Sequence, residues 1–388
     1  MAEPPHASAV SAVSSPEPSG LRRFTGSTLF WPVLALVALL LVDAVAVPNF
    51  LALRIQDGHL YGILIDILKN GTPTALIALG MTLVIATRGI DLSVGATVAI
   101  AGSVACTWIA GADDPTSPSA AVVAVLAALG LCLVLGAWNG MLVSLLGIQP
   151  IIATLVLMTA GRGLAMLITD GQIITVDNPL FAELGGGFLL GLPVSVILAA
   201  VVFAAVMLIT RRTALGMLIE SVGVNPVASR LAGVRSRGII WTVYVFVALC
   251  ACTAGLMISS NVTAADANNA GLWIELDAIL AVVIGGTLLT GGRYSIAGTL
   301  VGALILQTLT TTVYTAGIRP EVTLVFKAVV IIAVCLLQSP KARAVLRRRR
   351  APGRTAPPST PAPPAPRADV PSPAAPAPTP TDTTVSTR

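Results

Sequence analysis

The segment AAVVAVLAALGLCLVLGAW, residues 120–138, contains no charged side chain and decides the fold class. A helix rises about 1.5 Å per residue, so a run of about 20 residues crosses the apolar core of a bilayer, which is about 30 Å thick. The strands of a membrane β-barrel would instead alternate apolar and polar residues over about ten positions. This run is apolar throughout, which predicts an all-α, polytopic membrane protein.

Comparable runs recur along the chain of 388 residues, of which 55% are hydrophobic and 11% charged. In soluble domains, charged residues make up about a quarter. Residues 51–69 mix charged side chains with Leu and Ile at helical spacing and predict an interfacial helix. We predict ten transmembrane helices, at residues 30–47, 71–87, 92–110, 120–138, 151–168, 188–209, 239–257, 276–289, 295–315 and 322–338.

The composition divides the chain into three parts. Residues 1–29 predict a cytoplasmic N-terminal segment, residues 30–338 a transmembrane domain, and residues 339–388 a basic and then Pro/Ala-rich disordered tail. Residues 340–388 contain nine Lys/Arg and two Asp/Glu, so the formal net charge of +5 arises in this tail. Its basic cluster, residues 341–350, has no interleaved aromatic residues, which indicates membrane lipid and no nucleic acid as a partner.

The distribution of Lys and Arg predicts the orientation in the membrane. The loop at residues 210–238 carries five Arg and a single acid, Glu220, and both ends of the membrane domain are basic. These three regions are predicted to be cytoplasmic, which places both termini on the same side. The acid-rich loops then lie outside the cell.

Catalytic and metal-binding side chains are scarce. The five Cys lie in apolar stretches, where they behave as small hydrophobes, and the chain has only two His. We therefore predict no catalytic residues, no metal and no cofactor, and we rank a membrane-embedded enzyme last. The sequence has no GxxxxGK[ST] phosphate loop, so the energy for transport must come from a partner or from an ion gradient.

The predicted cytoplasmic loop at 210–238 contains the helix signature GVNPVASRLAG, residues 223–233. Asn225 is expected at the N-cap, Pro226 at the first helical position and Gly233 at a left-handed C-terminal cap. A helix of about two turns is marginal alone, so something must hold it. Two interpretations remain open: a capped helix that lies on the bilayer surface, or a docking element for a cytoplasmic subunit.

Ionisable residues at membrane depth are functional candidates because they are costly there. Arg162 lies inside the fifth predicted span, where it either pairs with an acid or with backbone carbonyls, or lines a pathway. The outer loop at residues 259–275 adds three amides, among them Asn261, and an aromatic ring, which suit a sugar or its binding protein, although a polar loop with an interfacial Trp explains them too. Candidates for a substrate pathway are Asp91, Arg162, Asn268, Asn269 and Trp273, and other ionisable residues at depth are Asp43, Asp277, Arg293 and Lys327.

Several motifs occur in a recognisable order. They are GMTLVIATRGIDLSVGATVAIAG (80–102), QPIIATLVLMTAGRGLAM (149–166), the signature at 223–233, and ELDAILAVVIGGTLLTGGRYSIAGT (275–299). Together they resemble the permease subunits of bacterial ABC importers for monosaccharides, of the ribose/xylose/galactose type, over about residues 30–340. Within that family, residues 264–286 most resemble the galactofuranose permease.

The resemblance implies the ribose/vitamin B12-type architecture and a place in the bacterial inner membrane. It also implies that two permease copies or paralogues form the pore, each with its loop helix seated on an ATP-binding subunit, while an extracytoplasmic binding protein delivers the sugar. The docking positions would be Gly223, Asn225, Ala228, Arg230 and Gly233. Glu220 and Ser229 depart from the family pattern, in which small apolar residues are usual.

An ion-coupled secondary transporter of a small polar solute is the alternative interpretation. It would use Asp43, Arg162 or Lys327 as a charge relay and would need no ATPase.

Overall fold

The computed structural model describes residues 29–56, 58–317 and 319, together with residues 322, 325, 327–329 and 332. The predicted N-terminal segment, apart from residue 29, and the predicted tail lie outside the described residues. The helices are α2 (Phe30–Ala46), α3 (Ile63–Ala86), α4 (Val94–Ala110), α5 (Pro118–Ser144), α6 (Pro150–Ile168), α7 (Pro179–Gly186), α8 (Val194–Arg212), α9 (Ala214–Val224), α10 (Pro226–Leu231), α11 (Ser236–Val262), α12 (Ile274–Ile284) and α13 (Ile296–Thr315). The strands are β1 (Arg54–Gln56), β2 (His59–Tyr61), β3 (Ile174–Thr175), β4 (Phe188–Leu189), β5 (Leu192–Pro193) and β6 (Ala264–Ala265).

Six of the described helices are long and apolar enough to cross a membrane: α3, α5, α6, α8, α11 and α13. Helices α2 and α4 are apolar but have only 17 residues each, and α12 has 11. The prediction of a mostly helical, polytopic membrane protein is confirmed. The count of ten spans is not, and most of the predicted last span, 322–338, lies outside the described residues.

The prediction of an interfacial helix at residues 51–69 was wrong. Strands β1 and β2 pair as an antiparallel hairpin there, and α3 already begins at Ile63. Contacts with the β4–β5 hairpin, which is distant in sequence, hold this arrangement. The Leu60 N–H donates to the Gly191 carbonyl at 2.9 Å, and the ring centroids of His59 and Phe188 are 4.7 Å apart. Such non-local pairing overrides local helical spacing. The β4–β5 hairpin also occupies the first residues of the span predicted at 188–209, so α8 begins only at Val194.

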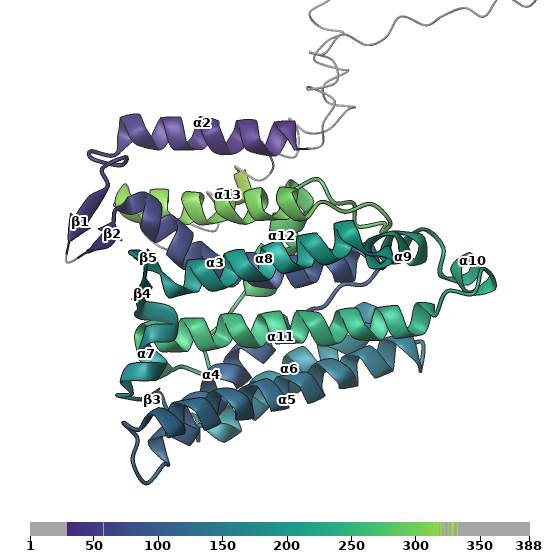
Figure 1. Cartoon of the computed structure of the whole chain (residues 1–388), viewed down its shortest axis with the longest axis horizontal. Coiled ribbons are helices and arrows are strands. Elements are labelled where there is room, and N and C mark those ends of the chain that lie inside the picture. The colour runs from purple at the N-terminus through teal and green to yellow at the C-terminus, as the bar shows by residue number, and fades with distance from the viewer. Residues whose placement is uncertain are drawn as a thin grey trace, which may run out of the picture. The chain divides into compact units, whose positions relative to one another are not determined.

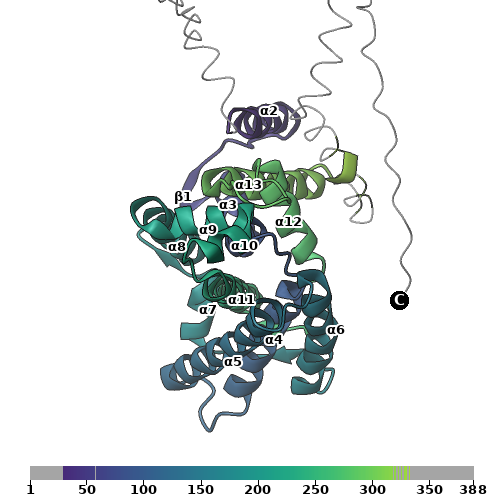
Figure 2. The same ribbon diagram turned by 90° about the vertical axis from the view of Figure 1, so that its right-hand side faces the viewer.

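Helix α3 lies at the centre of the described bundle, in contact with α8, α11, α12 and α13 (Figures 1 and 2). Every residue of α3 from 75 to 86 is buried. Gly80 allows its close approach to α11, because a Cβ at this position would lie 2.7 Å from the Val247 Cγ2 atom. Small residues that let helix backbones come close are typical of membrane helix packing.

The bundle has two distinct ends (Figure 1). Helices α9 and α10 lie at one end, which we call the α10 end, and the hairpins, α7 and the α4–α5 loop lie at the other, which we call the hairpin end. Helix α11 runs between them. Sites at the two ends are therefore linked by helices long enough to cross a bilayer.

Replacement of Gly80 by Val should destabilise the bundle, because the new methyl groups would meet Val247 across the α3–α11 contact. Overpacking of this kind costs about 1–3 kcal/mol. We expect a lower melting temperature in detergent by intrinsic fluorescence. Gly130→Val on α5 is the matched control, since a Cβ there would meet no atom within 4 Å. Equal melting temperatures for the two variants would contradict the close packing of α3 on α11.

Candidate functional site

The first candidate site is the α10 surface, residues 223–233, at the α10 end. The Asn225 side-chain oxygen accepts the N–H groups of Val227 and Ala228, each at 3.0 Å, and Pro226 begins the helix. Gly233 has a φ of +87°, the left-handed conformation that favours glycine. The predicted cap residues are confirmed at both ends of this short helix.

Apolar side chains on the α10 surface face outward. Val227 is 57% exposed and Leu231 is 87% exposed. Ala228 and Arg230 are exposed as well, whereas Ser229 is buried. Because Ser229 is buried, a serine in place of the usual small apolar residue does not change the exposed face of α10. Exposed apolar residues gathered at one place mark a surface that a partner can cover.

Gly223 connects this surface to the core of the bundle. It is buried, and a Cβ at this position would collide with the carbonyl oxygen of Ala86 at the end of α3. The same carbonyl accepts the N–H of Gly292, in the α12–α13 loop, at 2.9 Å. The Arg88 guanidinium also donates a hydrogen bond to the Val224 carbonyl. The segment that joins α9 to α10 is therefore in direct contact with the end of α3 and with the α12–α13 loop.

The second candidate site is the loop at residues 266–273, between β6 and α12. Arg162 projects from α6 to this loop, and its Nη1 donates to the carbonyls of Ala267 and Ala270 at 3.0 and 2.6 Å. The sequence left open whether Arg162 pairs with backbone carbonyls, and the structure shows that it does. A half-buried guanidinium thus holds a non-helical segment against a membrane-spanning helix.

Asp266 organises the loop from within. One carboxylate oxygen accepts the backbone N–H groups of Asn268 and Asn269 at 3.0 and 3.2 Å, and the other accepts the Asn269 side-chain amide at 2.7 Å. Asn268 and Asn269 are exposed. The arrangement fixes the backbone and leaves the Asn268 amide available to a ligand. The spacing of Asp266, Asn268 and Asn269 is a turn signal that is readable in the sequence.

Trp273 and Glu275 complete this site where α12 begins. Trp273 has a φ of +64° and is 54% exposed, so its indole stands clear of the packed core. Glu275 is only 4% exposed, and its Oε2 has no hydrogen-bond partner among the described residues. The carboxylates of Glu275 and Asp266 interact electrostatically with Arg162. The structure brings together Arg162, Asn268, Asn269 and Trp273, and it adds Asp266 and Glu275.

Asp91 lies elsewhere, in the turn between α3 and α4. It is 2% exposed and accepts the Ser93 N–H at 2.9 Å and the Ser93 hydroxyl at 2.6 Å. Asn139 of α5 donates in turn to the Ser93 hydroxyl at 2.9 Å. Burial raises the pKa of the Asp91 carboxyl to about 6, and the Ser93 hydrogen bonds oppose this rise. Asp91 therefore has almost no surface for a solute in this conformation.

The other ionisable candidates each have a separate environment. Asp43 accepts the Thr312 hydroxyl at 2.8 Å, which joins α2 to α13. The Lys327 ammonium forms an ion pair with Asp277 of α12 at 3.0 Å. Arg293 is exposed in the α12–α13 loop. Asp43 and Lys327 thus join neighbouring segments of the chain.

Comparisons with known proteins identify relatives along most of the chain. Residues 63–335 match the family described as "Branched-chain amino acid transport system / permease component". The galactofuranose transporter permease protein YtfT of Escherichia coli is 50% identical over 319 residues, 82% of this chain and 92% of that protein. The fructose import permease protein FruF of Bifidobacterium longum is 40% identical over 343 residues, 85% of this chain and 94% of that protein. The ribose import permease protein RbsC of Escherichia coli is 38% identical over 329 residues, 83% of this chain and 98% of that protein. No solved structure matches the chain.

Replacement of Arg162 by Gln should loosen the 266–273 loop, because two bonds from a charged donor to backbone carbonyls are lost. We expect hydrogen exchange of the loop amides to accelerate by about tenfold. Peptide-resolved exchange in detergent measures this. Thr159→Val, one turn earlier on α6, is the control, because that hydroxyl bonds only to carbonyls of its own helix. Unchanged exchange in the Arg162 variant would show that the loop is held by other contacts.

Proposed function

We propose, on the premise that this chain belongs to the family of branched-chain amino acid transport system permease components, that it is the membrane permease subunit of an ATP-driven sugar importer. The relatives carry permease names, so the chain is a transport component rather than an enzyme. The α10 surface is the observation that carries the proposal. It supplies an exposed, rigidly capped helix with a mechanical link to α3, as coupling to a cytoplasmic motor requires.

The proposed partner at the α10 surface is an ATP-binding subunit. Ala228 and Arg230 would contact it directly, since both are exposed. Asn225 and Gly233 would hold the helix in shape, and Gly223 would pass its movement to the end of α3. The excess of Arg in this region supports its place in the cytoplasm, together with both termini.

A monosaccharide is the proposed substrate, and galactofuranose is the first sugar to test. Support comes from the relative at 50% identity, which is named for galactofuranose, while the relatives at 40% and 38% are named for fructose and ribose. An extracytoplasmic binding protein would deliver the sugar at the hairpin end. A second permease copy or a paralogue would complete the pore.

The 266–273 loop is our proposal for part of the translocation pathway. The exposed Asn268 amide and the exposed Trp273 ring are groups that hydrogen-bond to and stack on sugars, and Arg162 keeps the loop in place. The buried position of Asp91 favours a supporting role for that residue. It would fix the α3–α4 turn rather than contact the sugar.

Ion-coupled transport finds less support. Asp43, Arg162 and Lys327, the charges that would form a relay, bind respectively to Thr312, to two loop carbonyls and to Asp277. The relatives also carry the names of import permeases. Uptake that persists in the presence of a protonophore at constant ATP would agree with the ATP-driven reading, and collapse of uptake would favour ion coupling.

Replacement of Ala228 by Glu should detach the ATP-binding subunit, because a bulky charge would enter the apolar contact. A mild-detergent pull-down of the tagged chain measures retention of that subunit, and we expect sugar uptake to fall to background. Ala228→Ser, which stays small, should retain both. Gly233→Pro should also lose the ATP-binding subunit and sugar uptake, since proline cannot adopt a φ of +87°. Gly233→Asn should retain both, because asparagine tolerates this conformation. Normal assembly of both Ala228→Glu and Gly233→Pro would rule out the docking role.

Replacement of Trp273 by Leu should lower uptake at sub-saturating galactofuranose by about tenfold, because the ring that stacks on the sugar is lost. Initial rates in membrane vesicles with the full transport system measure this effect. Trp138→Leu is the control, since this indole on α5 is similarly exposed but lies outside the loop. Equal uptake by the two variants would remove Trp273 from the pathway.

A further inference from the structure

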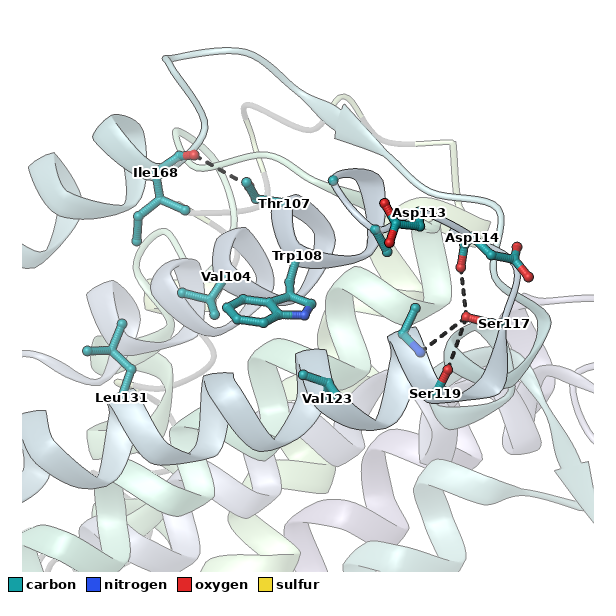
Figure 3. Close-up of a pocket in the computed structure, with 13 residues that line it drawn as sticks. Val104, Thr107, Trp108, Asp113, Asp114, Ser117, Ser119, Val123, Leu131 and Ile168 are labelled. Atoms are coloured by element: carbon teal, nitrogen blue, oxygen red, sulfur yellow. Dashed lines mark hydrogen bonds between the residues drawn. The ribbon is translucent and has the colours of Figure 1, made fainter.

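An open groove of about 980 Å³ lies along α4, α5 and α6 at the hairpin end (Figure 3). Its walls are mostly apolar, and the Trp108 indole lies along it between Val104 and Val123 (Figure 3). Trp108 is 52% exposed, and its indole N–H has no hydrogen-bond acceptor among the described residues. No Lys, Arg or His lines the groove.

One end of the groove is polar and acidic. Asp113 and Asp114 stand there, beside the N-terminus of α5, where the Ser117 hydroxyl donates to the Asp114 backbone carbonyl at 2.7 Å and accepts the Ser119 hydroxyl at 3.3 Å (Figure 3). One oxygen of Asp114 is occupied by the backbone and the hydroxyl of Thr116, at 3.0 and 2.7 Å. The Asp113 carboxylate forms no hydrogen bond or ion pair among the described residues. The groove thus has an apolar length and, at one end, carboxylates that can bind a cation.

The groove opens toward the surroundings of the bundle. Neighbouring outward side chains on α5 are large and apolar, among them Leu126 and Val134, which are exposed. On a helix that crosses a bilayer, such residues face lipid chains or another subunit. The groove therefore runs from the hydrocarbon region to its polar boundary, where an exposed Trp is typical.

We propose that this groove binds a phospholipid whose headgroup carries a primary ammonium group. The ammonium group binds to the carboxylates of Asp113 and Asp114, and an acyl chain lies against Trp108 and Val123. The phosphate lies near the N-terminus of α5, where the 27-residue helix presents its positive end, and within reach of the Trp108 N–H.

The charge of the groove selects among lipids. Phosphatidylglycerol, which is anionic, would meet two carboxylates with no basic residue to balance them. Phosphatidylcholine has a quaternary ammonium group that cannot donate hydrogen bonds to the carboxylates. Phosphatidylethanolamine has three N–H donors and suits both ends of the site, since charge-assisted hydrogen bonds are the stronger kind.

Native mass spectrometry of the delipidated full chain tests the proposal, with dioleoyl phosphatidylethanolamine, phosphatidylcholine and phosphatidylglycerol added in turn. We expect phosphatidylethanolamine to bind about tenfold more tightly than the other two, and D113N/D114N to abolish this preference. D177N, an exposed acid outside the groove, should keep it. W108L should weaken binding of all three lipids, whereas W138L should not.

Three results would overturn the proposal. The first is equal binding of the three lipids by the wild type, and the second is an unchanged preference in D113N/D114N. The third is a crosslink from a photoreactive residue at Val123 to a second copy of the chain, which would show that protein covers the groove. If D113N/D114N does not fold, as judged by gel filtration in detergent, the single variants D113N and D114N are measured in its place, each with a smaller expected loss.

Discussion

Every backbone polar group inside a bilayer needs a partner within the protein, and this constraint shapes the parts of the chain that are not helical. Residues 266–273 do not form a regular helix, and Arg162 supplies donors for two of their carbonyls while Asp266 supplies acceptors for two of their amides. The α12–α13 loop meets the same need differently. The Thr287 hydroxyl accepts the Ser295 N–H at 3.1 Å, and the Ala86 carbonyl accepts that of Gly292.

The same bonds connect the two candidate sites to different parts of the bundle. The α10 surface contacts the end of α3 through Gly223 and Ala86, and the Ala86 carbonyl in turn bonds to the α12–α13 loop. The 266–273 loop is bound instead to α6 through Arg162, and Glu275 in the first turn of α12 lies close to Gly95 of α4. Helix α12 begins at one of these loops and ends at the other, so it is the shortest covalent path between them.

The sequence predicts well what local physics decides. The boundaries of α6 and α13 follow from the lengths of their apolar runs. Both caps of α10 follow from the positions of Asn225, Pro226 and Gly233. The β1–β2 hairpin escaped prediction because it depends on Gly191 and Phe188, more than 100 residues away. The carbonyl partners of Arg162 are hidden for the same reason, since Ala267 and Ala270 carry no side-chain signal. Three of the five candidate pathway residues, Asn268, Asn269 and Trp273, are neighbours in the sequence, and the structure adds Arg162 to them through its bonds to Ala267 and Ala270.

Arg162 also restricts how a transport cycle can work. Breaking its two bonds to the loop would leave a half-buried cation and two carbonyls without these partners, and a buried polar group left unpaired costs about 1–3 kcal/mol. A low-cost conformational change therefore keeps α6 and the 266–273 loop together as one body. Helix α3 is buried along most of its length and touches the α10 surface directly, so a force applied at Gly223 reaches it first. We infer that the two candidate sites communicate through displacement of α3 and the α12–α13 loop relative to the unit that Arg162 holds together.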